Sequence, residues 1–400
     1  MGVRSPSDNA PRPLRWDLFC RVVDNYGDLG VCRRLALNLA TLKQAVRLWV
    51  DDAALMRTMA PDIPLAGPTA VKDPGVAWVH WRHAHEAGCS QEPGDVVVEA
   101  FGCDPPAAFV ERMVRRSVQE GQAAALWINL EHLSAEDHVE RSHGLPSPQG
   151  SGPGAGLTKW FFYPGFTPRT GGLLREAGLQ ERRRCFDLPA WLRGVGVPVE
   201  GERRVAVFAY PQAPLESLMD SLTATALNDG IPVRLMLTTG PLQLRARRWL
   251  QQRALAWPAL QLTPLPWLGS QEFDHLLWAC DLNLVRGEDS PVRAIWAGQP
   301  FIWQFYPQHD GVHALKLKAF RDRVLAAGAG AWLTALDPWW RAWNSLCPWP
   351  SDIQFPWVHL PVWQAQVESV GMALASRPSL AVSLLDFVED HRRGAPSRLE

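Results

Sequence analysis

The stretch WDLFCRVVDNYGDLGVCRRLALNLATLK, residues 16–43, contains the pattern on which the fold prediction rests. Apolar residues predominate at 16–23 as in a buried strand, and from Gly30 to Lys43 they recur at helical spacing. The segment DNYGDLG, residues 24–30, joins the two as a tight loop. A strand, a loop and a helix in this order form the repeating unit of an α/β domain with a parallel sheet.

The rest of the first half repeats this alternation. Short apolar runs predict further strands at Val46–Val50, Val76–Trp81, Val96–Phe101 and Ala124–Leu130, with a helical stretch at Pro105–Gln119. The segment GLPSPQGSGPGAG, residues 144–156, is too rich in Gly, Pro and Ser for a regular element. Because the aromatic run Trp160–Tyr163 follows closely, we expect an exposed functional loop there.

A second alternating series begins after Gly194–Gly201. Its predicted strands are Arg204–Ala209, Val233–Thr238, Asp281–Val285 and Pro300–Phe305, and its predicted helices are Leu215–Leu227, Pro241–Leu255, Gln271–Ala279 and Pro291–Ala297. The restart places the change of domain near residues 190–203. From Val362 to Arg393 the pattern is helical, with no strand between the helices.

These elements predict a flexible arm at residues 1–14, an N-terminal Rossmann-like domain at 15–193 and a C-terminal Rossmann-like domain at 200–365. We expect a helix at about 378–393 to pack back on the first domain. Two facing Rossmann-like domains with a central cleft are the layout of the α/β GT-B glycosyltransferases, although two α/β domains alone also fit other folds.

Composition excludes several classes of protein. Forty basic residues against 41 acidic ones leave a formal charge of −1, so no bulk basic surface favours nucleic acid. The seven cysteines are scattered and contain no Cys-x-x-Cys pair, which fits a reducing cytoplasm. No apolar run approaches the length of a membrane span, and residues 1–15 contain no apolar signal core. We therefore expect a cytoplasmic protein without nucleic-acid or membrane partners.

The first candidate for chemistry is DNYGDLG itself. It follows a strand of a predicted parallel sheet, at the edge where ligands bind. Asp24 and Asp28 bring two carboxylates to the start of the next helix, and Gly27 lets the backbone approach a ligand. Either acid alone is as well explained as an N-cap, but two within five residues favour catalysis. Asn25 and Tyr26, with Gly27, are candidates for donor binding.

The second candidate is RGEDSPVRAIWAGQP, residues 286–300, where a strand ends and a helix begins near Pro291. Free N–H groups at the helix start, with Asp289 and Ser290 beside them, predict an anion cradle that would hold a diphosphate with Arg286. Glu288 would then accept hydrogen bonds from sugar hydroxyls. The alternative is an ordinary helix cap beside a surface charge cluster.

The third candidate is aromatic. Phe208 and Tyr210 leave the first strand of the second half, and Trp267 lies in the turn PLPWLGS. Rings at strand ends could sandwich a nucleobase, although each ring alone is better explained as core. His80, His83 and His85 lack a confirming carboxylate cluster, so we interpret them as surface or structural residues rather than metal ligands.

Together these segments resemble the elongation factor P arginine rhamnosyltransferase family, EarP. The resemblance runs from the Trp16 strand to about Phe320. The matching segments are VVDNYGDLGV (22–31), WINLEHLS (127–134), HGLPSPQ (143–149), LTKWFFYPGFTPRTGGLLRE (157–176), VFAYP (207–211) and LLWACDLNLVRGEDSPVRAIWAGQPFIWQFYPQHDGVH (276–313).

The resemblance implies a GT-B fold, dTDP-β-L-rhamnose as donor and an arginine of elongation factor P as acceptor. It implies inversion at the anomeric carbon, and neither a metal nor another cofactor. The N-terminal domain would bind the acceptor and the C-terminal domain the nucleotide sugar.

The resemblance also assigns roles to residues. Asp28 would be the catalytic acid/base, Asp24 would shape the acceptor site, and Glu288 would join them at the reacting sugar. Asp289 and Ser290 would contact the donor's sugar and diphosphate; Phe208, Tyr210 and Trp267 would surround thymidine. Where the family often has Pro-Gln, Gly269 and Ser270 follow Leu268 here, so donor contact from Ser270 or Gln271 stays open.

Two other functions remain alternatives. One is a GT-B glycosyltransferase with another donor or acceptor. The other is a non-catalytic protein that binds a nucleotide sugar or a translation factor. Two acids in one half and an anion cradle in the other favour an enzyme, because binding alone does not require both. We expect the acceptor near Asp24, Tyr26 and the loop 144–156.

Overall fold

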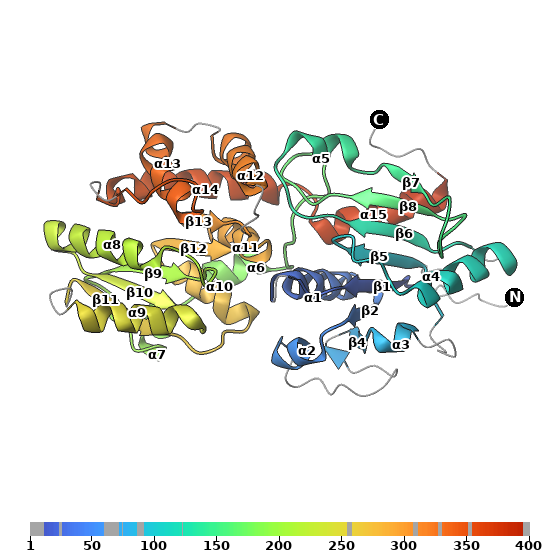
Figure 1. The fold of residues 1–400 in the computed structure, drawn as a ribbon, viewed down its shortest axis with the longest axis horizontal. Coiled ribbons are helices and arrows are strands. Elements are labelled where there is room, and N and C mark those ends of the chain that lie inside the picture. The colour runs from blue at the N-terminus through green and yellow to red at the C-terminus, as the bar shows by residue number, and fades with distance from the viewer. Residues whose placement is uncertain are drawn as a thin grey trace, which may run out of the picture. The chain divides into compact units, whose positions relative to one another are not determined.

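The computed structural model describes residues 12–23, 26–59, 72–73, 75–85, 92–121, 123–253, 258–306, 311–326, 330–350 and 354–394 (Figure 1). The chain divides into two compact units. Unit 1 comprises residues 1–132, 140–175 and 378–400, and unit 2 comprises 133–139 and 176–377.

Unit 1 contains, in its described part, an eight-stranded sheet in the order β3-β4-β2-β1-β5-β6-β8-β7. The strands are β1 (Arg15–Cys20), β2 (Ala45–Val50), β3 (Lys72–Asp73), β4 (Val76–His80), β5 (Val96–Ala100), β6 (Leu126–Leu130), β7 (Pro146–Pro148) and β8 (Thr158–Phe162). The six strands from β4 to β8 in this order are parallel, and β3 and β7 pair antiparallel at the two edges. The parallel strands therefore all end at one edge of the sheet.

The helices of unit 1 alternate with these strands. They are α1 (Tyr26–Thr41), α2 (Ala53–Met59), α3 (Arg82–His85), α4 (Ala107–Val114), α5 (Asp137–Ser142) and α15 (Leu380–Arg393). The helix α4 continues as a π-helix over Arg115–Gln119, and the first half of α5 groups with unit 2. Figure 1 shows α15 beside β8. Phe387 of α15 lies with its ring centroid 5.4 Å from that of Phe162, and α15 also contacts α1. The last described helix thus belongs to unit 1.

Aromatic rings build the core on one face of this sheet. Phe19 stacks on Trp49 at 5.2 Å and meets Phe109 of α4 edge-on at 4.7 Å. At the amino-terminal edge, the buried carboxylate of Asp17 accepts hydrogen bonds from Arg47 at 2.6 Å and from Trp49 Nε1 at 2.8 Å. This interaction joins β1 to β2 beneath the aromatic cluster.

Unit 2 contains, among the described residues, a five-stranded parallel sheet in the order β11-β10-β9-β12-β13. Its strands are β9 (Arg203–Val207), β10 (Val233–Leu237), β11 (Leu260–Pro264), β12 (Leu282–Arg286) and β13 (Phe301–Gln304). Its helices are α6 (Leu179–Arg184), α7 (Leu188–Gly194), α8 (Leu215–Asp229), α9 (Pro241–Gln252), α10 (Ser270–Ala279), α11 (Asp289–Ala297), α12 (Val312–Phe320) with a π-helix over Arg321–Leu325, α13 (Ala331–Trp343) and α14 (Leu360–Ala375), which follows a 3-10 turn at Trp357–His359. None of the helices in the described ranges is both long and apolar enough to cross a membrane.

The chain passes from one unit to the other at Glu176, earlier than the predicted residues 190–203. The reason is the packing of α6 and α7. Leu192 is fully buried and packs in one cluster with Ala206 and Met236 of the unit 2 sheet. These helices therefore cover unit 2, although they precede its first strand.

Several elements differ from the sequence predictions. The helix α1 begins at Tyr26, so Asp28 lies in its first turn rather than in a loop before Gly30. The segment 144–156, for which we expected no regular element, contributes β7, which pairs with β8. In the predicted arm, residues 1–11 lie outside the described residues, but the N–H of Leu14 donates to Gln44 at 3.2 Å.

The packing of α15 yields a stability prediction. Leu384 is fully buried on α15, so Leu384→Ala should lower the free energy of unfolding by about 2–5 kcal/mol through lost burial and the cavity left behind. Leu315→Ala on α12 is the matched control, because that leucine is 62% exposed, and it should cost about 0.5 kcal/mol or less. Urea denaturation measures both; equal midpoints for the two variants would contradict the described position of α15.

His143 yields a prediction about pH. Burial lowers its pKa from 6.5 to about 4, and its Nδ1 accepts the N–H of Tyr163 at 3.0 Å. Because the folded protein binds this proton less tightly than the unfolded chain, the contribution is present above pH 6.5 and is lost as the pH falls toward 4. At pH 5 the loss should be about 2 kcal/mol.

His143→Asn keeps an acceptor for Tyr163 but cannot titrate. The difference in unfolding free energy between pH 7.5 and pH 5, from urea titrations, should therefore shrink by about 2 kcal/mol in this variant. An unchanged difference would show that His143 does not carry this dependence.

Candidate functional site

The predicted catalytic segment lies at the carboxyl-terminal edge of the unit 1 sheet. Asp28 is buried in the first turn of α1, and its Oδ2 accepts the N–H of Val23 at 2.8 Å. The positive end of the helix dipole favours a carboxylate at this place. Tyr26 and Gly27 are half-buried in the same turn. Asp24 and Asn25 lie outside the described residues.

The strand order gives this edge its importance. Going out from β1, the sheet continues through β2 and β4 on one side and through β5 and β6 on the other. The switch point of unit 1 therefore lies between β1 and β5, and ligands of such sheets bind outside the strand ends at this point. Asp28 follows β1, and the turn Phe101–Asp104 follows β5.

Several residues at this edge were not selected as site residues from the sequence. Phe101 has a φ of 59° although it is not glycine, and its ring stacks on His132 with centroids 4.5 Å apart. Glu131, directly after β6, accepts a hydrogen bond from the buried Asn129 at 2.7 Å. Burial raises the pKa of Tyr163, and the negative charge of Glu131 raises it further. The available sequence signal for Asn129 and Glu131 was that these two polar residues alternate with the apolar Ile128 and Leu130.

Unit 2 brings three of its predicted residues together at a second switch point, between β9 and β12. The Arg286 guanidinium lies 4.8 Å from the ring centroid of Phe208 and 4.5 Å from that of Tyr210. Cation–π attraction therefore holds the three side chains as one group. The ring of Phe208 also meets Phe273 of α10 at 5.3 Å. Sequence analysis did not select Phe273.

The RGEDS turn is closed by its own residues. The hydroxyl of Ser290 accepts the N–H of Arg286 at 3.0 Å and donates to its carbonyl at 2.6 Å. Gly287 has a φ of 68°, a backbone conformation that residues other than glycine rarely adopt. Its carbonyl accepts the indole N–H of Trp303 at 2.6 Å. Ser290 is thus a buried structural member of the turn that places Arg286 beside the aromatic rings.

The two acids of this turn have different partners. Glu288 stands immediately before α11, and its Oε2 accepts the N–H of Leu133 at 3.0 Å. Asp289 accepts the Nε–H of Arg293 at 2.8 Å, and the same guanidinium donates to Asp274 at 2.9 Å. Arg293 is only 4% exposed, so Asp289 helps to neutralise a buried charge.

Trp267 lies between β11 and α10 and is 44% exposed. Its loop is two strands away from the end of β9 but at the same edge of the sheet. Ser270 begins α10, and Gln271 follows in its first turn. The contacts of these residues with a donor stay predictions.

Metal binding has no candidate site within the described ranges, where no group of three or more His, Cys, Asp or Glu side chains is suitably placed. Among the three neighbouring histidines, His80 accepts the N–H of Arg82 on its Nδ1 at 3.1 Å. Burial lowers its pKa, and the positive charge of Arg82 lowers it further.

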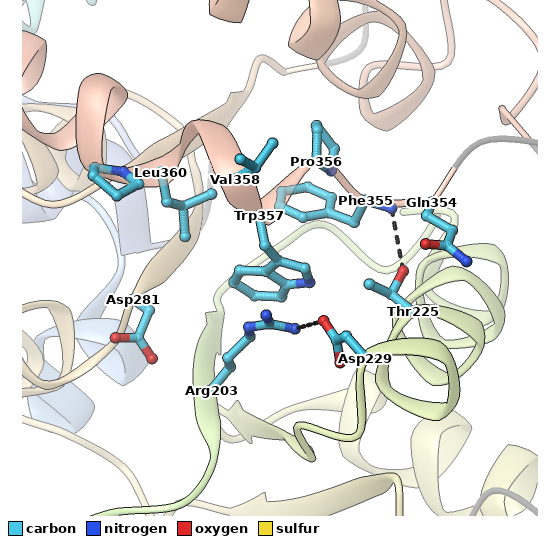
Figure 2. Close-up of a pocket in the computed structure, with 11 residues that line it drawn as sticks. Arg203, Thr225, Asp229, Asp281, Gln354, Phe355, Pro356, Trp357, Val358 and Leu360 are labelled. Carbon is cyan, nitrogen blue, oxygen red and sulfur yellow. Dashed lines mark hydrogen bonds and ion pairs between the residues drawn. The ribbon is translucent and has the colours of Figure 1, made fainter.

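A pocket of about 570 Å³ lies elsewhere in unit 2 (Figure 2). Trp357 covers the guanidinium of Arg203, 4.8 Å from the ring centroid, and Arg203 pairs with Asp229. Arg203 begins β9, whereas Phe208 follows its end. The pocket therefore occupies the amino-terminal edge of the sheet, away from the predicted donor residues.

Comparisons with known proteins show the family and the fold of the chain. The family model for the elongation factor P (EF-P) rhamnosyltransferase EarP matches residues 16–389. The protein-arginine rhamnosyltransferase of Pseudomonas putida is 42% identical over 395 residues, covering 93% of this chain and 98% of the relative. That of Pseudomonas aeruginosa is 38% identical, covering 94% and 99%.

Solved structures give the same result for the fold. The structure that describes EarP-mediated arginine glycosylation of translation elongation factor EF-P is 31% identical, covers 94% of this chain and 99% of that chain, and has a TM-score of 0.60. TcCGT1 in complex with UDP is 11% identical, covers 96% and 100%, and has a TM-score of 0.51, which shows the fold alone. The predicted α/β GT-B fold is confirmed.

The interaction of Asp289 with Arg293 yields a testable prediction. Asp289→Asn should lower the free energy of unfolding by about 1–3 kcal/mol, because the buried guanidinium loses one of its anionic partners. Asp322→Asn is the matched control, because Asp322 forms the same i,i+4 pair with Lys318 on an exposed surface. The control should change stability by about 0.5 kcal/mol or less in urea denaturation. A loss no greater than that of the control would exclude a structural role for Asp289.

Proposed function

The chain belongs to the EarP family of elongation factor P rhamnosyltransferases, and from this premise we propose dTDP-β-L-rhamnose as its donor and an arginine of EF-P as its acceptor. The chain is a protein-arginine rhamnosyltransferase. A cytoplasmic location fits a translation factor as substrate. The observation that carries the proposal is the buried, oriented Asp28 carboxylate at the switch point of unit 1.

The acceptor sets the chemical problem. A guanidinium has a pKa of about 12.5 or more, so it stays protonated and its nitrogens are poor nucleophiles. A fixed carboxylate helps in two ways. It orients the guanidinium through charge-assisted hydrogen bonds, and it accepts the proton as the nitrogen attacks the anomeric carbon.

Asp28 meets these requirements. Its Oδ2 is occupied by the N–H of Val23, which fixes the direction of the carboxylate. Attack by the guanidinium nitrogen from the face opposite the departing diphosphate inverts the anomeric carbon. Asp24, which lies outside the described residues, is proposed to shape the acceptor site beside Asp28.

The donor would bind to unit 2. The half-buried Phe208 is proposed to stack on thymine, and Trp267 is exposed enough to join it. Tyr210 is only 3% exposed, so its proposed role is to hold Arg286 beside the nucleotide. The N-terminus of α11, which begins at Asp289, offers backbone N–H groups to the diphosphate. Glu288 would contact the rhamnose hydroxyls.

Arg286 and the helix N-terminus would also stabilise the negative charge that develops on the leaving thymidine diphosphate. We therefore propose that transfer needs no divalent cation and no other cofactor. Activity that persists in excess chelator would support this part of the proposal.

The test is the intact mass of purified EF-P after incubation with this enzyme and dTDP-β-L-rhamnose. EF-P should gain one deoxyhexose with the wild-type chain. Asp28→Asn should reduce the initial rate by at least about a hundredfold, because an amide cannot accept the proton.

Asp52→Asn is the control, since Asp52 is an exposed acid that caps α2 through the N–H groups of Ala54 and Leu55. Its rate should match that of wild type. Transfer from dTDP-rhamnose to another protein but not to EF-P would overturn the proposed acceptor. Transfer only from a different nucleotide sugar would overturn the proposed donor.

A further inference from the structure

A polar residue of β6, Asn129, and the residue directly after the strand, Glu131, face the same side of the sheet. Asn129 and Glu131 are two positions apart, so their side chains leave the strand in the same direction. The Nδ2 of Asn129 donates to Glu131 Oε1 at 2.7 Å, and its Oδ1 accepts the N–H of Gly102 at 3.0 Å. Asn129 is 5% exposed. A buried amide therefore fixes the position of the Glu131 carboxylate.

The neighbouring turn is strained. Phe101, Gly102 and Asp104 have φ values of 59°, 64° and 47°. Positive φ at non-glycine residues costs about 1–3 kcal/mol each and clusters at ligand sites. The turn is nevertheless held firmly, because the N–H of Phe101 donates to Leu130 at 2.7 Å and the N–H of Gly102 donates to Asn129. The strained turn and Glu131 are thus parts of one bonded arrangement.

Glu131 differs electrostatically from the three buried, ion-paired acids of unit 1. The buried carboxylates of Asp17, Asp95 and Glu99 form ion pairs with Arg47, with Arg12 and Arg116, and with Lys159, respectively. Glu131 is half-buried, yet it forms no ion pair with any residue that the structure describes. Removing a charged carboxylate partly from water costs free energy when no cation lies beside it, and a bound cationic ligand would offset this desolvation cost.

The location identifies the cation. Glu131 follows β6, which pairs with β5 beside β1, and Asp28 follows β1. Neighbouring strands are about 4.8 Å apart, so the ends of β1 and β6 are separated by about 10 Å. The loops that carry the two carboxylates therefore start from strand ends that leave room for a planar guanidinium, whose five donors can bind two carboxylates at once.

We propose that Glu131, positioned by Asn129, binds the guanidinium of the acceptor arginine together with Asp28. This inference rests on the proposed function and divides the work between the two acids. Glu131 holds the positive charge and the orientation of the guanidinium, while Asp28 accepts the proton from the attacking nitrogen. Asn129 acts through Glu131 and is a positioning residue.

The test is steady-state transfer from dTDP-β-L-rhamnose to EF-P, with KM and kcat measured separately for the two substrates. Glu131→Gln should raise the KM for EF-P at least about tenfold, because a charge-assisted bond is lost. The KM for the donor and the melting temperature should stay at wild-type values. Glu131→Asp, which keeps the charge, should recover part of the affinity for EF-P.

Asn129→Ala should also raise the KM for EF-P, and the double variant should be no worse than Glu131→Gln alone. This non-additivity separates positioning from a general structural defect. Glu111→Gln is the control, because Glu111 is exposed on α4 of the same unit. Wild-type transfer with an unchanged KM for EF-P in Glu131→Gln would overturn this inference alone. Absence of transfer by the wild-type chain would overturn the proposed function and the inference together.

Discussion

All strands of a parallel sheet end at the same edge, and the placement of both candidate sites depends on this constraint. Each connecting helix returns the chain to the opposite edge, so loops distant in sequence converge where the strands end. In unit 1 the segments that meet at this edge are the start of α1, the turn at Phe101 and the residue Glu131. In unit 2 it joins the loops after β9 and β12. The same constraint leaves the pocket beside Trp357 at the other edge, where β9 begins.

Charged residues near these edges fall into two groups with different physical roles. Asp17 and Asp289 are paired with arginines and serve the fold, and the hydroxyl of Ser290 closes a turn. Arg286 and Glu131 are held in place by neutral neighbours, which agrees with the proposed action of their charges on a ligand. Within one motif, such as RGEDS, some polar residues therefore stabilise the fold, and others are proposed to contact the ligand.

The sequence was sufficient to predict most strands, because buried parallel strands are continuous apolar runs. β11 was missed because its run, LQLTP, is short and ends in Pro264, a residue typical of turns. The domain boundary was misplaced because periodicity shows that α7 is amphipathic but not which sheet its Leu192 covers. In the candidate site, motif and position led to the choice of Asp28, Phe208, Tyr210 and Arg286, whose roles stay predictions. Glu131 and Asn129 were not chosen, because the reason to propose them comes only from strand order and from the turn of the neighbouring strand.

Unit 1 is discontinuous in sequence, because α15 follows the whole of unit 2. During synthesis from the N-terminus, every strand of unit 2 leaves the ribosome before α15 does. Unit 2 can therefore complete its core first, while Phe162 of β8 still lacks its contact with Phe387. The half of the enzyme that begins the chain is thus the last to finish folding, and a nascent chain that stops before residue 380 exposes an uncovered sheet to chaperones and proteases.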